Sequence, residues 1–173
     1  MFDTVLVAGL GLMGGSMAKT IKARTLSRVL GWNRTRATAE QALADGSIDA
    51  IATDALFREV DLVIIGLYPQ ATVDWLLENM PKMKKGCVIV DMVGVKQFMV
   101  DHLEQAALDA GVHYVGGHPM AGREFSGLDY ALPTLFDGAS MIFVPTRSSS
   151  ERILSQLEAY FMSLGFGQTV RCT

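Results

Sequence analysis

The sequence is short of several features that mark large classes of proteins. It contains only two cysteines, Cys87 and Cys172, which are too far apart in the sequence to suggest a disulfide framework or a metal-binding pair. No apolar run approaches the roughly 20 residues that a transmembrane helix requires. The amino-terminal stretch MFDTVLVAG has no basic residue ahead of its apolar run, unlike a signal peptide. These absences favour a cytoplasmic protein with reduced thiols and no metal site.

The sequence also lacks an excess of positive charge. Its 18 acidic and 15 basic residues give a net charge of −3, so no basic field marks it as a nucleic-acid-binding protein. Hydrophobic residues, by contrast, make up 50% of the chain. A chain of 173 residues is long enough to bury a substantial core and is expected to form one domain. We therefore expect a single domain over residues 1–173 that binds small molecules, with no membrane or nucleic-acid partner.

Short apolar segments alternate with helical patterns along the chain. The segments DLVIIGL and GCVIVD are continuously apolar, which indicates strands that are buried on both faces, as in a parallel sheet covered by helices. The alternation predicts an α/β fold with a doubly wound, mostly parallel sheet of the Rossmann type. The segment over residues 116–140 has no clear periodicity, and irregular segments of this length tend to be functional. The expected strands cover residues 4–8, 28–32, 48–52, 61–67, 86–91, 112–115, 141–144 and 168–171, and the expected helices cover residues 14–23, 35–44, 70–80, 95–110 and 149–164.

The segment GLGLMG follows the first expected strand and opens the first helix. In a dinucleotide-binding turn, the first glycine permits the sharp bend and the second lets the backbone approach a pyrophosphate. The third allows the helix to pack closely on the strand, and the helix amino terminus attracts the negative charge. This placement predicts a dinucleotide site rather than a turn without a ligand. The expected contacts are Gly9, Leu10, Gly11, Leu12, Met13 and Gly14.

The residues after the second expected strand bear on the choice between NAD and NADP. A carboxylate there would bond the adenosine 2′-hydroxyl, whereas this chain has Asn33, Arg34, Thr35 and Arg36. A neutral amide, two guanidinium groups and a hydroxyl suit a 2′-phosphate, because arginine forms charge-assisted hydrogen bonds to phosphate. The alternative is a solvated helix start with Thr35 as its N-cap. The pattern favours NADP, and NAD stays possible.

A histidine in the segment YVGGHPMAGREFSG is the candidate for proton transfer. Ligands of open α/β sheets bind outside the carboxyl ends of the strands, where the Tyr68-Pro69 turn, Gly94 and His118 are all expected. The nicotinamide end of the cofactor should therefore lie near these residues. A histidine at that edge can take a proton from a hydroxyl while hydride leaves the same carbon. The other two histidines, His102 and His113, are expected to have structural roles.

Three segments resemble the nucleotide-binding domain of prephenate and arogenate dehydrogenases. They are GLGLMGGSMA, GCVIVD with the downstream Val-Lys pair, and above all GGHPMAGREFSG. The resemblance implies NAD(P)-dependent oxidative decarboxylation in tyrosine biosynthesis, with hydride leaving C4 of the substrate ring. It implies that His118 bonds the C4 hydroxyl and acts as the base. It also implies that Glu124 organises the pocket entrance and that Lys96 and Pro119 shape the loop.

Two features depart from the family pattern. Family members usually carry a serine before the Val-Lys pair, where it contacts substrate and nicotinamide, but this chain has Gly94. Family members also continue into a helical domain, absent here, that dimerises and supplies an arginine for a substrate carboxylate. The resemblance thus implies that a full-length form is a homodimer through that domain. Arg123, the only basic residue of the histidine loop, would either replace the missing arginine in part or be a solvated surface residue.

Two other functions remain open from the sequence. GLGLMGGSMA and GWNRT also resemble 3-hydroxyacid dehydrogenases of the hydroxyisobutyrate type. Such an enzyme would need a catalytic lysine in a following domain and has no reason to carry HPMAGRE. The second alternative is a cofactor-binding module without turnover, which Gly94 and the absent domain favour. Prephenate and arogenate are equal candidates for the substrate, because the residues that distinguish them are expected outside this chain.

Overall fold

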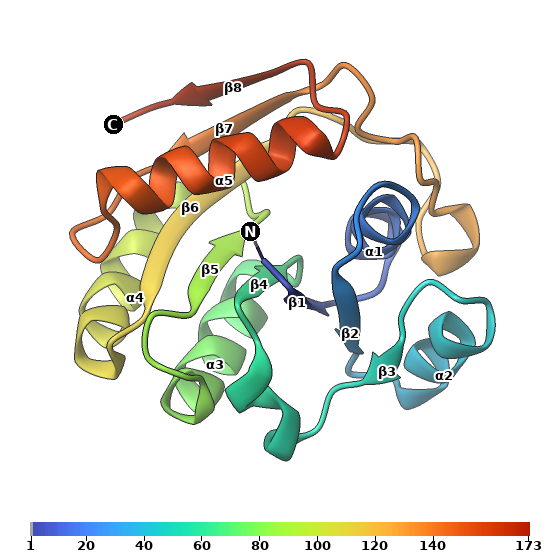
Figure 1. Cartoon of the computed structure of the whole chain (residues 1–173), viewed down its shortest axis with the longest axis horizontal. Helices are drawn as coiled ribbons and strands as arrows, with labels where there is room; N and C mark the ends of the chain where they lie inside the picture. Colours follow the sequence, from blue (N-terminus) through green and yellow to red (C-terminus); the bar gives the residue numbers. More distant parts are fainter. Residues whose placement is uncertain (1) are drawn as a thin grey trace.

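The computed structural model describes residues 2–173, which fold around one eight-stranded sheet (Figure 1). The strands are β1 (Thr4–Ala8), β2 (Arg28–Trp32), β3 (Ala50–Ile51), β4 (Leu62–Ile65), β5 (Val88–Asp91), β6 (His113–Pro119), β7 (Ser140–Val144) and β8 (Gln168–Arg171). The α-helices are α1 (Leu12–Arg24), α2 (Arg36–Ala44), α3 (Pro69–Asn79), α4 (Lys96–Ala110) and α5 (Glu151–Ser163). Three short 3₁₀ helices, which the sequence patterns did not predict, are η1 (Asp54–Glu59), η2 (Met80–Lys82) and η3 (Leu128–Tyr130).

The strand order is β3-β2-β1-β4-β5-β6-β7-β8. All neighbouring strands from β3 to β6 are parallel, β7 is antiparallel to β6, and β8 is parallel to β7. The chain winds outward from β1 in both directions, so β1 and β4 flank the point where the strand order reverses, which is where open α/β sheets bind ligands. The predicted α/β fold with a doubly wound, mostly parallel sheet is confirmed.

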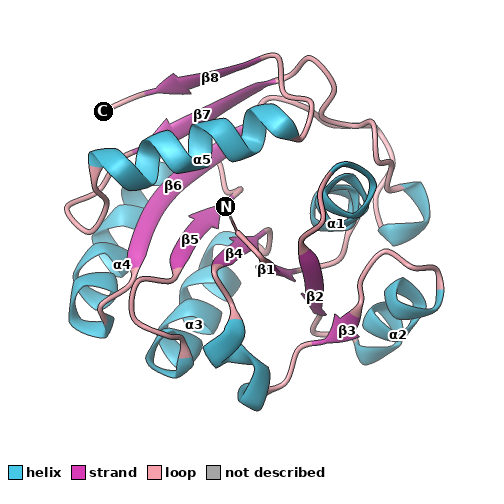
Figure 2. Cartoon of the chain, in the orientation of Figure 1, coloured by secondary structure: helices cyan, strands magenta, loops and turns pink. Residues whose placement is uncertain are grey.

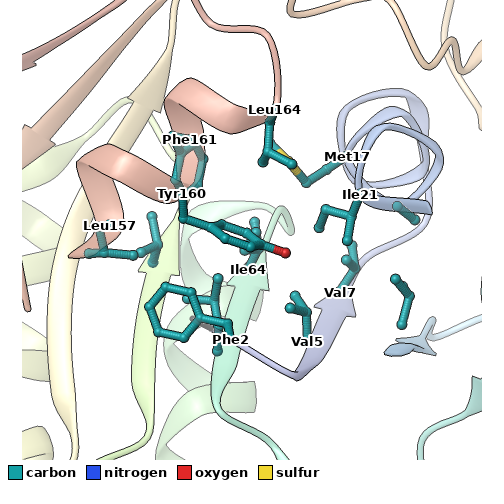
Figure 3. Close-up of a cluster of buried hydrophobic side chains, with 14 of the residues drawn as sticks. Phe2, Val5, Val7, Met17, Ile21, Ile64, Leu157, Tyr160, Phe161 and Leu164 are labelled. Atoms are coloured by element: carbon teal, nitrogen blue, oxygen red, sulfur yellow. The ribbon is translucent and has the colours of Figure 1, made fainter. Parts of the chain in front are cut away.

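Helices cover both faces of the sheet (Figure 2). Val5 and Val7 belong to a core shared with α1, α2 and α5, whereas Leu6 and Ala8 belong to a second core shared with α3 and α4. All four side chains are fully buried, which explains why the strand sequence is continuously apolar. Figure 3 shows part of the first core, where the rings of Phe2 and Tyr160 meet edge to face with centroids 5.2 Å apart.

The structure corrects the expected boundaries of several strands. The fourth strand spans Leu62–Ile65 rather than residues 61–67, and the fifth spans Val88–Asp91 rather than residues 86–91. The third strand spans only Ala50–Ile51 rather than residues 48–52. The sixth strand was expected to end at residue 115, which is wrong: β6 runs to Pro119, and its last four residues pair antiparallel with β7. A glycine is required in this extension of β6, because a Cβ atom at Gly117 would lie 2.3 Å from the carbonyl oxygen of Asp91 in β5. The glycine pair before the histidine therefore permits close strand packing rather than a loop.

Asp61 joins the starts of three strands. Its Oδ2 atom accepts the backbone N–H groups of Asp3 and Thr4, each at 2.9 Å, and its Oδ1 atom pairs with Lys84 ahead of β5. Partial burial would raise the pKa of this carboxyl, but the hydrogen bonds from Lys84 and Thr4 outweigh that effect and lower it. The ionised carboxylate therefore stabilises the fold.

We expect Asp61→Asn to lower the free energy of unfolding by about 1 kcal/mol at pH 7, because a neutral amide accepts these bonds more weakly than a carboxylate. The pKa of Asp61 is lower in the folded chain than its ordinary value of 3.8. The stabilisation is therefore complete above that value and disappears as the pH falls through the folded pKa. The unfolding free energies of the unmodified chain and of Asp61→Asn should therefore become equal at low pH. Urea unfolding between pH 2 and pH 7 checks this, with Asp3→Asn, at an exposed position, as the control.

Candidate functional site

The glycine turn has the geometry expected of a phosphate-binding turn. Gly9 has a φ of +90°, which favours glycine, and a Cβ atom at Gly14 would lie 1.6 Å from the carbonyl oxygen of Gly9. At Gly11, by contrast, a Cβ atom would meet nothing within 4 Å. Gly9 and Gly14 thus allow the bend and the close packing of α1, while Gly11 faces open space.

The open space lies at the amino terminus of α1. Gly11 is the N-cap and forms no side-chain cap, so the N–H groups of Leu12 and Met13 receive no capping side chain. The first turn of α1 contains no acidic residue that would repel an anion. Free N–H groups and the positive end of the helix dipole fit the pyrophosphate of a dinucleotide.

Asn33 holds this turn against the start of α2. Its Oδ1 atom accepts the N–H of Leu10 at 2.9 Å, and its Nδ2 atom donates to the carbonyl oxygen of Thr35 at 3.1 Å. Thr35 occupies the N-cap position of α2, as the alternative of a solvated helix start expects, but its side chain makes no cap hydrogen bond. Arg36 pairs with Glu40, whereas Arg34 is exposed and forms no ion pair or hydrogen bond within residues 2–173.

The turn after β4 lies beside the glycine turn. A Cβ atom at Gly9 would lie 2.8 Å from both the carbonyl oxygen of Gly66 and the Cδ2 atom of Leu67. Tyr68 follows at the N-cap position of α3 with its side chain 87% exposed, and Pro69 is the first residue of that helix. The fold therefore brings these two predicted cofactor contacts to the edge where the glycine turn lies.

His118 lies at the same edge, near the carboxyl end of β6. A Cβ atom at Gly94, which follows β5, would lie 3.7 Å from Cε1 and 3.9 Å from Nδ1 of the imidazole. Nδ1 is buried and has no hydrogen-bond partner in the described chain. Buried polar atoms rarely lack a partner, and those that do often mark functional sites. Nε2 is the nitrogen that remains available to a bound molecule.

A buried polar network lies at the end of β5, beside the glycine that precedes the histidine in β6. The carboxylate of Asp91 is fully buried and accepts the Tyr114 hydroxyl at 2.6 Å and the backbone N–H of Val93 at 2.8 Å. Lys96, the first residue of α4, forms an ion pair with the same carboxylate. Burial raises the pKa of Tyr114, with a further contribution from Asp91, so its hydroxyl stays protonated and donates.

A cavity of about 490 Å³ opens between α4 and β7. Its polar wall includes His118, Gly94 and Lys96, and its apolar wall includes Val100, Ile142 and Val144. The volume lies within the usual range for small-molecule sites. The cavity therefore combines an imidazole, a cation and an apolar surface, a set of groups that suits an anionic substrate with a ring and a hydroxyl group.

The loop beyond β6 is attached to α1 rather than to this cavity. Arg123 donates to the carbonyl oxygen of Tyr130 at 2.7 Å and lies over the Phe125 ring, whose centroid is 5.3 Å away. Leu128 packs against Gly15 of α1, where a Cβ atom would lie 2.7 Å from Leu128 Cδ1. Glu124 is exposed and has no hydrogen bond or ion pair within residues 2–173. The structure thus does not bring Arg123 into the cavity beside the histidine.

Two further findings concern residues 2–173. No cluster of three or more His, Cys, Asp or Glu side chains there could hold a metal ion. No helix of this part of the chain is both long and apolar enough to cross a membrane.

Comparison with known families decides the classification. The family model described as prephenate dehydrogenase, nucleotide-binding domain, matches residues 17–168. The chain belongs to this family. The match includes the histidine segment and the Gly94 region, and it begins within α1, after the glycine turn.

Two curated relatives show how much of the longer proteins the chain covers. Prephenate dehydrogenase from Bacillus subtilis is 35% identical over 162 residues, which cover 91% of this chain and 43% of that protein. Cyclohexadienyl dehydrogenase from Zymomonas mobilis is 25% identical over 167 residues, which cover 95% of this chain and 56% of that protein. The chain thus spans about half the length of the curated relatives it matches.

Solved structures agree with the family assignment. Arogenate dehydrogenase from Synechocystis superimposes with a TM-score of 0.87 at 26% identity, covering 98% of this chain and 59% of that one. Prephenate dehydrogenase from A. aeolicus, in complex with hydroxyphenyl propionate and NAD+, has a TM-score of 0.89 at 24% identity, covering 100% and 60%. The 3-hydroxyisobutyrate dehydrogenase from Mycobacterium tuberculosis is 16% identical with a TM-score of 0.78, covering 99% and 55%. At 24% and 16% identity, the last two likenesses support only a shared fold.

Proposed function

We propose that this chain is the cofactor-binding and proton-transferring part of a prephenate or arogenate dehydrogenase. The observation that carries the proposal is the position of His118, whose imidazole meets Gly94 at the carboxyl edge of the sheet and lines a cavity. The membership of the family and the similarity to arogenate dehydrogenase from Synechocystis support this function. A complete protein of the relatives' length would, by similarity, be a homodimer through the part outside this chain.

His118 would supply the base for the oxidation. A bound nicotinamide dinucleotide supplies the hydride acceptor. Nε2 would take the proton of the C4 hydroxyl while the hydrogen on C4 leaves as hydride, so that C4 becomes a carbonyl carbon. The bond between the ring and its carboxylate then breaks and carbon dioxide leaves. The electron pair of that bond enters the ring, which becomes aromatic as the carbonyl pair moves onto the C4 oxygen and that oxygen takes up a proton. Glu124 would organise the entrance, and Lys96 and Pro119 would hold the segment around the histidine.

The second part of the proposal is a preference for NADP. The residues of the glycine turn and of the Tyr68-Pro69 turn would contact the dinucleotide in either case. Arg34 supports the preference, because its exposed guanidinium is free of ion pairs in the described chain and follows β2 where an acidic residue would favour NAD. Asn33 would act indirectly by positioning the turn, since both ends of its amide are already bonded.

We expect Arg34→Ala to weaken NADP binding roughly 10- to 100-fold, because a charge-assisted hydrogen bond to phosphate is worth about 1.5–3 kcal/mol. NAD binding should change little. Arg36→Ala is the matched comparison and should have a smaller effect, because Glu40 already holds that guanidinium. Calorimetric titration with both cofactors measures these affinities. Tighter binding of NAD than of NADP by the unmodified chain would show that the preference is wrongly assigned.

One alternative function is favoured by a specific observation. The unpartnered Nδ1 atom of His118 beside Gly94 is a poor arrangement for a base, which favours a cofactor-binding module without turnover. Hydride transfer to NAD and NADP should be assayed on a protein of the relatives' full length with prephenate, arogenate and 3-hydroxyisobutyrate, with the Bacillus subtilis enzyme as the positive control. Turnover of prephenate or arogenate supports the dehydrogenase. Cofactor binding with no turnover of any substrate supports the module.

A further inference from the structure

The cavity beside His118 contains the cation of Lys96 and not that of Arg123. Lys96 is the only Lys or Arg side chain among the described residues that line this cavity. The guanidinium of Arg123 is instead held by the Tyr130 carbonyl oxygen and the Phe125 ring. Lys96 is therefore the cation that a molecule in this cavity would meet.

The position of the Lys96 ammonium group is fixed on two sides. Its Nζ atom pairs with the fully buried carboxylate of Asp91. Its stem lies against β6, since a Cβ atom at Gly116 would be 3.0 Å from Lys96 Cδ. A side chain held in this way loses little further conformational entropy when it binds a ligand.

The Lys96 ammonium group also retains free donors. An ammonium group has three N–H donors, and Asp91 is its only hydrogen-bond acceptor within residues 2–173. Asp91 in turn accepts two uncharged donors, the Tyr114 hydroxyl and the Val93 N–H group. The Lys96 side chain is 17% exposed. The free donors are therefore available to a ligand in the cavity.

Desolvation makes an anionic ligand favourable at this position. Burial lowers the pKa of Lys96, and the Asp91 carboxylate opposes that effect. An ammonium group that has lost part of its hydration gains more from a second carboxylate than a fully solvated lysine does. The apolar wall formed by Val100, Ile142 and Val144 suits the uncharged part of the same ligand.

We propose that Lys96 binds a carboxylate of the substrate and so orients the substrate ring toward His118. This inference rests on the proposed function, because it assumes an anionic cyclohexadienol as the substrate. It assigns the recognition of the negative charge to the first residue of α4 instead of to Arg123. Lys96 is then a specificity-determining residue, and the Asp91 carboxylate and Tyr114 hydroxyl are its positioning groups.

Binding of two matched probes tests the inference. The probes are 3-(4-hydroxyphenyl)propionate and its uncharged amide, which differ in the carboxylate alone. Binding to the NADP-saturated chain is followed by NMR through the imidazole signals of His118, which are assigned with His118→Asn. We expect the unmodified chain to bind the carboxylate at least 10-fold more tightly than the amide. Lys96→Met should abolish this preference, whereas Lys96→Arg should keep most of it and Arg123→Ala all of it.

Loss of the Lys96 charge also leaves Asp91 buried without its cation, which threatens the fold. The double variant Asp91→Asn/Lys96→Met removes both charges and is measured alongside, with circular dichroism as the check on folding. A carboxylate preference that survives in either Met variant, or that is lost in Arg123→Ala, overturns the role proposed for Lys96 but leaves the proposed function intact. If the unmodified chain binds NADP but neither probe, the proposed substrate class is wrong and the inference falls with it.

Discussion

Substitution of His118 by Asn is expected to lower the turnover number roughly 10²- to 10⁴-fold, which is the usual effect of losing a general base. Asparagine keeps a polar side chain of similar size but cannot take the proton of the C4 hydroxyl. Cofactor affinity should stay nearly constant, because the glycine turn and the residues after β2 lie on other strands. Steady-state kinetics with prephenate or arogenate and calorimetry with NADP, on a protein of the relatives' full length, measure the two quantities.

His102→Asn is the matched control for this substitution. His102 lies on the exposed surface of α4, where its Nδ1 atom is 2.8 Å from the carbonyl oxygen of Phe98. Its replacement should leave turnover unchanged. If His118→Asn retained most of the wild-type turnover, the imidazole would have no part in the proton transfer.

Local sequence patterns were sufficient to predict the sheet and the glycine turn. The strand at residues 4–8 is continuously apolar because Val5 and Val7 face one helical layer while Leu6 and Ala8 face the other. The glycine spacing predicts the turn because each requirement, a positive φ or a close contact, lies within a few residues. Such features depend on neighbours in the sequence and can be recognised without the fold.

Features that depend on distant residues could not be predicted in this way. The pair Gly116-Gly117 resembles a loop in the sequence, and its place in β6 follows from pairing with β7 and from the contact of Gly117 with the end of β5. The link between Asp91 and Tyr114 spans 23 residues, and no motif in the chain indicates it. The position of Arg123 was likewise undetermined until its loop was seen to fold onto its own aromatic rings.

The Nδ1 atom of His118, which has no hydrogen-bond partner in the described chain, is the basis for a second prediction with a large expected effect on turnover. When Nε2 takes a proton, Nδ1 must carry a hydrogen, and in this chain that buried N–H group has no acceptor. A buried donor without a partner costs about 1–3 kcal/mol, and this cost increases as the imidazolium forms. An acceptor near Nδ1 would lower the barrier to proton transfer, as the orienting group of a catalytic triad does.

Gly94→Ser would supply that acceptor and is expected to raise the turnover number about 10-fold. Gly94 is not among the glycines with positive φ, and a Cβ atom there would make only ordinary contacts with the ring, at 3.7 and 3.9 Å. The serine oxygen lies one bond beyond Cβ and can approach Nδ1. Gly94→Ala adds the same Cβ atom without the hydroxyl and should leave turnover near the wild-type value. Equal rates for the serine and alanine variants would show that the missing acceptor does not limit the base.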